Sequence, residues 1–248
     1  MARYWIGTSG WSYANWRGAF YPRGLRSGDW LGYYARHLAS VEINATFYRP
    51  PRPAMLAGWA EKTPADFVFA VKVWRAISHF KRLRGCDQAL ADFLERIRPL
   101  GAKAGPLLIQ LPPRFARDPE RLAAFLAMVP RGRRFAFEFR DPSWHTDEIF
   151  ELLARHNAAF CPFELGGARA PRVATADFVY VRLHGPAAPY QGAYTEAALR
   201  DWAGWLRARM AEGRDAYVYF DNTDEANHAV RDAMALARLM ASPPETNI

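Results

Sequence analysis

The chain has 248 residues, of which 50% are hydrophobic, and it carries a formal net charge of +8 at pH 7. This length and composition allow a sizeable buried core and are typical of a single α/β barrel domain. No apolar stretch approaches the roughly 20 residues that a membrane-spanning helix requires, and the N-terminus has neither the basic region nor the apolar run of a signal peptide. We therefore expect a cytoplasmic protein with no membrane partner, in which Cys86 and Cys161 are buried thiols and not a disulfide.

The positive charge permits binding to phosphate groups, either of nucleic acid or of a small ester. The arginines, however, are dispersed along amphipathic stretches that also contain acidic residues, as in Arg200, Asp201, Arg209 and Glu212. There is no compact run of lysine and arginine. This pattern favours a solvated surface over a nucleic-acid footprint.

Eight short segments are rich in apolar residues and are predicted to be strands: 4–8, 40–44, 67–73, 106–111, 135–140, 158–163, 178–184 and 216–221. Between them apolar residues recur at helical spacing, as in Leu90, Phe93 and Ile97. Asp118 precedes a proline and a glutamate, which predicts the start of a helix because Asp118 caps the first turn and the glutamate favours the helix dipole.

Strand and helix alternate through eight units, which predicts an α/β fold, namely a single (β/α)8 barrel of TIM type with parallel strands. We expect one domain over residues 1–241 and a frayed tail over 242–248. The sixth unit is the weakest because residues 166–175 are rich in Gly, Ala, Arg and Pro. A short or irregular sixth helix is therefore expected there.

Two of the predicted strands end in charged residues at alternate positions. Glu138 and Arg140 share one face of their strand, as do Arg182 and His184 on theirs. Charge inside a sheet is costly unless it is partnered or used in function. Because the carboxyl ends of barrel strands converge on one mouth, where binding and chemistry occur, these four side chains predict a functional site there.

Other strand ends add polar and aromatic residues to the same mouth. Glu42 and Lys72 end the second and third predicted strands in apolar surroundings. The remaining candidates for substrate binding are Ser9, Trp11, Asn44, Tyr48, His79, Gln110, Tyr190 and Asn222. Tyr190 lies in the segment 185–192, which we predict to cover the site.

Several motifs follow one another along nearly the whole chain. They are Gly7-Thr8-Ser9-Gly10-Trp11-Ser12-Tyr13 with Trp16, Phe20-Tyr21-Pro22, Val41-Glu42-Ile43-Asn44 with Thr46-Phe47-Tyr48-Arg49, Gln110-Leu111-Pro112-Pro113, Glu138-Phe139-Arg140 with Ser143-Trp144, and Arg182-Leu183-His184-Gly185. This series resembles the YecE-like proteins, a widespread prokaryotic family also called domain of unknown function 72. The resemblance implies a TIM-type barrel and implies no established activity.

The excess of ionisable groups at strand ends favours an enzyme that applies general acid/base chemistry to a small anionic substrate, phosphorylated or carboxylated and sugar-like. The candidate catalytic residues are Glu42, Glu138, His184 and Lys72, while Arg140 and Arg182 are expected to hold the anion with help from Lys72. Lys72 is also a candidate amine for Schiff-base formation, because apolar surroundings lower the pKa of a lysine. The sequence does not separate a hydrolase from a lyase or an isomerase.

Three alternatives remain open. The glutamates could simply neutralise neighbouring cations in a structural network, the protein could bind or process nucleic acid, or the mouth could bind a small ligand without catalysis. No cofactor is predicted. A divalent metal held by Glu42, Glu138 and His184 is conceivable, but no ligand spacing in the sequence supports it.

Overall fold

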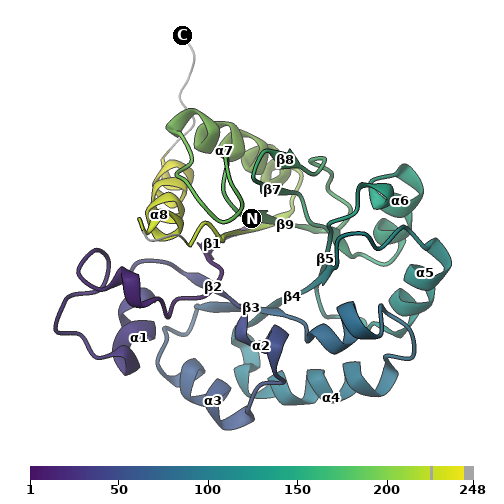
Figure 1. The fold of residues 1–248 in the computed structure, drawn as a ribbon, viewed down its shortest axis with the longest axis horizontal. Coiled ribbons are helices and arrows are strands. Elements are labelled where there is room, and N and C mark those ends of the chain that lie inside the picture. Colours follow the sequence, from purple (N-terminus) through teal and green to yellow (C-terminus); the bar gives the residue numbers. More distant parts are fainter. Residues whose placement is uncertain (224–225, 243–248) are drawn as a thin grey trace.

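The computed structural model describes residues 1–223 and 226–242. Within these residues the strands form two five-stranded sheets, with the orders β1-β10-β9-β7-β8 and β2-β3-β4-β5-β6. The strands are β1 (Tyr4–Thr8), β2 (Ser40–Ile43), β3 (Val68–Lys72), β4 (Ala104–Leu111), β5 (Phe135–Phe139), β6 (Ala159–Phe160), β7 (Phe163–Leu165), β8 (Ala168–Arg169), β9 (Phe178–Leu183) and β10 (Asp215–Phe220). Neighbouring strands run parallel except for β7 and β8. Figure 1 shows the two sheets facing a common centre, with the helices outside.

The helices occupy the connections between strands, as predicted from the alternating pattern. They are α1 (Trp30–Tyr34), α2 (Ala45–Tyr48), α3 (Pro53–Glu61), α4 (Asp87–Ile97), α5 (Pro119–Met128), α6 (Asp147–Arg155), α7 (Glu196–Ala211) and α8 (His228–Ala241), with short 3-10 or π turns η1 (Ala14–Trp16), η2 (Ser27–Asp29), η3 (Ala76–Phe80), η4 (Arg98–Lys103) and η5 (Pro142–Trp144). Asp118 caps α5 by accepting a hydrogen bond from the Arg121 backbone N–H at 3.0 Å. No helix in the described part of the chain is long and apolar enough to cross a membrane.

The two sheets meet at the edge between β1 and β2, where one tyrosine hydroxyl replaces part of the ladder. Tyr34 Oη accepts a hydrogen bond from the Thr8 N–H and donates one to the Ser40 carbonyl, both at 2.9 Å. A Cβ at Gly7 would lie 1.9 Å from the Ser40 oxygen, so only glycine allows this approach. Two residues after Thr8 and Ser40, the Gly10 N–H donates to the Glu42 carbonyl at 2.8 Å. Hydrogen bonds therefore connect β1 and β2, although the two strands do not form a continuous ladder of backbone hydrogen bonds.

The sixth predicted strand is divided between the two sheets. β6 pairs with β5, and β7 pairs with β9, with Cys161 and Pro162 between them. The following segment holds the short antiparallel pair β7–β8 and then irregular chain up to β9, which confirms the expectation of an irregular sixth connection. Of the tail predicted to fray, residues 243–248 lie outside the described residues.

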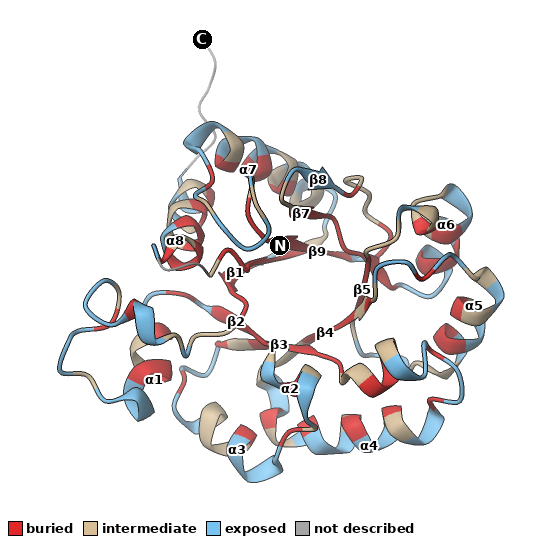
Figure 2. Ribbon diagram, in the orientation of Figure 1, coloured by how far each residue is buried: buried red, intermediate tan, exposed pale blue. Residues whose placement is uncertain are grey.

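Large and small side chains from the two sheets complement each other at the centre. β1, β9 and β10 contribute aromatic residues, and the facing strands contribute mostly small ones, with Leu108 as the exception. This inner cluster comprises Trp5, Ala70, Leu108, Ala136, Ala159, Cys161, Ala176, Phe178, Tyr180, Tyr217 and Tyr219. Figure 2 shows the strands as almost continuously buried, except for β8, which is exposed. Cys86 and Cys161 are both buried free thiols, as predicted.

Candidate functional site

Arg182 on β9 is the centre of a buried ionic network. Its guanidinium donates to Glu42 from Nε (3.0 Å to Oε2) and from Nη2 (2.7 Å to Oε1). Nη1 donates to Glu138 Oε2 at 2.8 Å, and Nη2 lies 3.2 Å from Asp221 Oδ2. Arg182, Glu42 and Glu138 are 0% exposed. One arginine from β9 thus holds carboxylates from β2, β5 and the end of β10.

Glu42 is fully engaged by its neighbours. Besides Arg182, it accepts hydrogen bonds from the Ser9 hydroxyl at 2.5 Å and from the Tyr180 hydroxyl at 2.6 Å. Each carboxylate oxygen therefore has two donors, which is close to the capacity of its lone pairs. These four hydrogen bonds hold the Glu42 carboxylate in place, and they include Ser9 in the network as its partner.

Glu138 on β5 connects the network to Arg140. The Arg140 Nε donates to Glu138 Oε1, and Arg182 holds the other oxygen. Burial alone would raise the pKa of Glu138, but the charges of Arg140 and Arg182 outweigh burial and hold the pKa well below its usual value. Glu138 is therefore ionised at neutral pH.

His184 has one nitrogen against the Asp221 carboxylate, while the other faces two guanidinium groups and lies 3.4 Å from Glu138 Oε2. Nδ1 lies 2.9 Å from Asp221 Oδ2, and Nε2 lies 3.1 Å from Arg140 Nη2 and 3.3 Å from Arg182 Nη1. Guanidinium groups only donate, so Nε2 can pair with Arg140 and Arg182 only as an acceptor. Burial opposes ionisation of Asp221, but the His184 hydrogen bond and Arg182 lower its pKa.

Lys72 is the last residue of β3. Unlike Arg140 and Arg182, it forms no ion pair with a carboxylate among the described residues. Its side chain is 7% exposed and its ammonium lies 4.4 Å from the centre of the Phe47 ring. Within residues 1–223 and 226–242, no carboxylate lies within ion-pair distance of it, because the arginines already hold Glu42, Glu138 and Asp221. Burial and the Arg182 charge lower the pKa of Lys72 to about 8, despite those more distant carboxylates.

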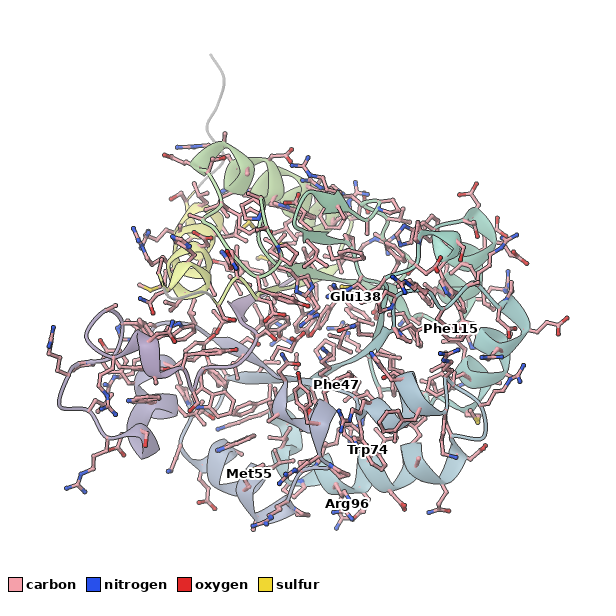
Figure 3. All side chains as sticks on the ribbon, in the orientation of Figure 1. Phe47, Met55, Trp74, Arg96, Phe115 and Glu138 are labelled. Atoms are coloured by element: carbon pink, nitrogen blue, oxygen red, sulfur yellow. The ribbon has the colours of Figure 1, made fainter. Side chains whose placement is uncertain are left out.

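His79 on η3 experiences the same cationic surroundings. Its ring packs edge-on against Phe47 at 4.9 Å, and its Nδ1 lies 2.9 Å from the Ser78 hydroxyl. Burial, together with the charges of Lys72, Arg75, Arg140 and Arg82, lowers its pKa to about 4. His79 is consequently neutral at pH 7 and lies in a positive field. Figure 3 shows Phe47, from α2, and Glu138, from β5, both toward the centre of the ring of strands.

Three other predicted residues lie beside this cluster. Tyr190 is 45% exposed, and its ring meets that of His184 edge-on at 5.6 Å. Gln110 is half-buried and pairs in register with Glu138. Asn44 is half-buried, and its buried Oδ1 has no hydrogen-bond partner among the residues described. All three neighbour the predicted mouth without joining the ionic network.

Two predicted binding residues have other neighbours. The Trp11 ring packs edge-on against Trp59 of α3 at 4.7 Å. Asn222 donates from Nδ2 to Asp232 at 2.7 Å and to the Gly192 carbonyl at 2.8 Å, so it holds the loop after β9 to α8. Among the described residues, neither side chain forms a hydrogen bond with the network around Arg182.

Two members of the network, Asp221 and Tyr180, are not among the site residues predicted from the sequence. Asp221 follows β10 directly and precedes Asn222, which was predicted as a binding residue. Because side chains alternate between the two faces of a strand, alternation is the signal that could have separated Asp221 from Asn222. Tyr180 is two residues before Arg182 on the same face of β9, in a run that reads as ordinary apolar strand. Its hydroxyl contact with Glu42 depends on the opposite sheet and has no signal in the sequence.

The described residues contain no group of three or more His, Cys, Asp or Glu placed to hold a metal ion. Glu42, Glu138 and His184, the trio considered from the sequence, each face guanidinium groups. These contacts use the lone pairs that a metal ion would need.

Comparisons with known proteins agree with the resemblance noted in the sequence. Residues 5–247 match the family described as "Protein of unknown function DUF72". The chain is 36% identical over 141 residues to UPF0759 protein YecE of Escherichia coli K12, covering 56% of this chain and 49% of that protein, so the match spans about half the relative's length. It is 24% identical over 263 residues to UPF0759 protein YunF of Bacillus subtilis, covering 91% of this chain and 90% of that protein.

The fold of the chain also agrees with that of a solved member of this family. The crystal structure of a DUF72 family protein from Thermotoga maritima superposes with a TM-score of 0.87 at 26% identity, covering 97% of this chain and 100% of that one. A match of the family over nearly the whole length, together with this shared fold, means that the chain belongs to the DUF72 family of proteins of unknown function.

Proposed function

We propose that this protein is an enzyme that binds a small anionic substrate, phosphorylated or carboxylated, at the C-terminal ends of its strands and acts on it by general acid/base chemistry. The observation that carries the proposal is the Lys72 ammonium, which is almost buried and has no carboxylate in contact among the described residues. A buried charge is costly unless it is paired. A substrate anion is the partner that this cation lacks.

Arg140 is the second group proposed to hold the anion. Its side chain is 8% exposed, and it uses Nε for Glu138 and Nη2 for His184. A guanidinium has five N–H donors in a planar fork, so donors remain for a phosphate or carboxylate. Glu138 would orient this fork, and Glu42 would hold Arg182 beneath it. In this proposal the two glutamates are positioning residues.

Proton exchange is assigned first to Lys72. General acid/base catalysis is most effective when the pKa of the group lies near the working pH, and the pKa of Lys72 is lowered to about 8. His184 is the second candidate, because its Nε2 lies 3.1 Å from Arg140 Nη2 and would exchange that partner for the substrate when Arg140 turns to an anion, while Arg182 stays 3.3 Å away. Glu138, whose pKa lies well below its usual value, would be a weak base.

The first test measures binding of inorganic phosphate by calorimetry at pH 7. Lys72→Met, which keeps the length of the side chain and removes its charge, should weaken phosphate binding at least about tenfold, since a charge-assisted contact is worth about 1.5–3 kcal/mol. Lys62→Met is the matched control, because Lys62 is an exposed lysine that donates to the Gly28 carbonyl. Equal affinity of wild type and Lys72→Met would refute the proposed site.

Catalysis is tested separately from binding. Wild type and Lys72→Met are incubated with a panel of phosphorylated and carboxylated sugars, and products are followed by NMR. Turnover that disappears in Lys72→Met supports the enzyme. Phosphate binding without turnover of any compound would support a non-catalytic ligand-binding protein instead.

We also infer that the two sheets act as one (β/α)8 barrel. The division of the sixth strand supports this, because β6 and β7 are separated only by Cys161 and Pro162 while pairing with different sheets. The Tyr34 bridge and the Gly10 contact support it at the other edge. In such a barrel, the residues around Arg182 would form the floor of the mouth.

A further inference from the structure

Exposed aromatic side chains gather beside the proposed anion site. Tyr48 at the end of α2 is 59% exposed, and Phe80 at the end of η3 is 69% exposed. Both follow strand ends, after β2 and β3, and so lie on the same side of the sheets as Lys72. Exposed aromatic residues that neighbour each other mark binding surfaces more often than isolated ones do.

Arg75 lies between these two aromatic residues. Its guanidinium is 5.7 Å from the centre of the Tyr48 ring and 5.3 Å from that of Phe80. Among the residues described, no carboxylate forms an ion pair with Arg75. We call Tyr48, Arg75 and Phe80 the aromatic rim. It combines two exposed aromatic rings with a half-buried planar cation, and both kinds of group can stack on flat rings.

The aromatic rim is continuous with the proposed anion site. The Lys72 ammonium contacts the Phe47 ring at 4.4 Å, and the centres of the Phe47 and Tyr48 rings are 5.2 Å apart. Phe47 also meets His79, whose pKa is lowered first by burial and then by surrounding cations. Along this path exposure rises from the buried ammonium to the solvent-facing rings. A ligand that spans it needs an anionic end at the bottom and a flat, apolar part at the rim.

We propose that the substrate of this site is a nucleotide unit, with its phosphate at Lys72 and Arg140 and its base stacked on the aromatic rim. This inference rests on the proposed function, whose anion site it uses. A purine or pyrimidine stacks on both aromatic rings and a guanidinium plane, whereas a saturated sugar ring gains little from Arg75. The unit is either a free nucleotide or the terminal residue of a single strand.

The experiment measures binding of four probes by calorimetry: inorganic phosphate, glucose 6-phosphate, AMP and a 5′-phosphorylated DNA hexamer. Phe80→Ala should weaken AMP binding about tenfold, a typical effect of removing a stacking ring, and leave phosphate binding unchanged. Phe80→Tyr should retain AMP affinity, and Phe80→Leu should lose it, because stacking needs a π face. Phe80 is exposed, so these variants should unfold at the wild-type temperature, which thermal melts check.

The outcomes separate this inference from the proposed function. If Lys72→Met weakens phosphate and AMP alike while Phe80→Ala leaves AMP unchanged, the nucleotide inference is wrong and the anion site stands. Glucose 6-phosphate binding as tightly as AMP also overturns it. If wild type binds no phosphate and no AMP, both fail. Affinity for the hexamer that exceeds that for AMP and falls steeply with salt identifies a strand as the source of the nucleotide unit, whereas equal affinities identify a free nucleotide.

Discussion

The Arg182 guanidinium donates to both oxygens of Glu42, from Nε at 3.0 Å and from Nη2 at 2.7 Å, with both side chains removed from solvent. Such a pair is costly to break, because the remaining charge is left buried without a partner. We predict that Arg182→Leu lowers the free energy of unfolding by about 3–5 kcal/mol, measured by urea denaturation. Arg96→Leu, on the outer side of α4 (Figure 3), is the control and should change it little. A loss below about 1 kcal/mol for Arg182→Leu, as for an exposed pair, would show that the network contributes little.

A second prediction concerns the edge between the sheets. Tyr34→Phe removes the hydroxyl that satisfies the buried Thr8 N–H and Ser40 carbonyl. Leaving buried polar groups unsatisfied should cost about 1–3 kcal/mol of stability. Tyr33→Phe, one residue earlier, removes a hydroxyl for which no hydrogen bond is found within the described ranges. Thermal and urea unfolding of both variants test the prediction, and it is contradicted if they lose the same amount.

A third prediction follows from the lowered pKa of Lys72. The folded protein releases this proton near pH 8, whereas the unfolded chain keeps it up to about pH 10.5. Between these values the unfolded state binds more protons, so stability should rise with pH, by roughly 3 kcal/mol in total from this group. The rise is absent in Lys72→Met. The measurement is the difference in unfolding free energy between wild type and variant from pH 7 to 10.5, and a constant difference would contradict it.

A fourth prediction concerns anion binding and pH. Only the protonated form of Lys72 attracts an anion, so phosphate affinity should fall as pH rises through about 8. Inorganic phosphate itself changes charge near pH 7, so sulfate, which stays a dianion over this pH range, is titrated in parallel. The fall should be seen with sulfate in wild type and be lost in Lys72→Met. Sulfate affinity that is constant from pH 6.5 to 9.5 would remove Lys72 from the anion site.

The sequence was informative where local pattern and strand alternation decide the outcome. Alternation placed Glu138, Arg140, Arg182 and His184 on the strand faces that the structure brings together. Apolar spacing identified α4, whose Leu90, Phe93 and Ile97 are buried. Short-range rules of this kind need only the residues themselves and their neighbours along the chain.

The tertiary structure decided which of the charged residues at strand ends are paired with other side chains. Glu42 and Lys72 read alike in the sequence, as charged residues ending apolar strands. In the fold, Tyr180 and Ser9 come from other strands and complete the coordination of Glu42 together with Arg182, whereas Lys72 receives no carboxylate among the described residues. Whether a charge is satisfied depends on side chains distant in sequence, such as the pair Tyr180 and Glu42, 138 residues apart. The sequence alone therefore determined the family, the strand and helix pattern and the charged strand ends, and only the packing of the two sheets determined which charged groups are paired and that Lys72 has no carboxylate partner among the described residues.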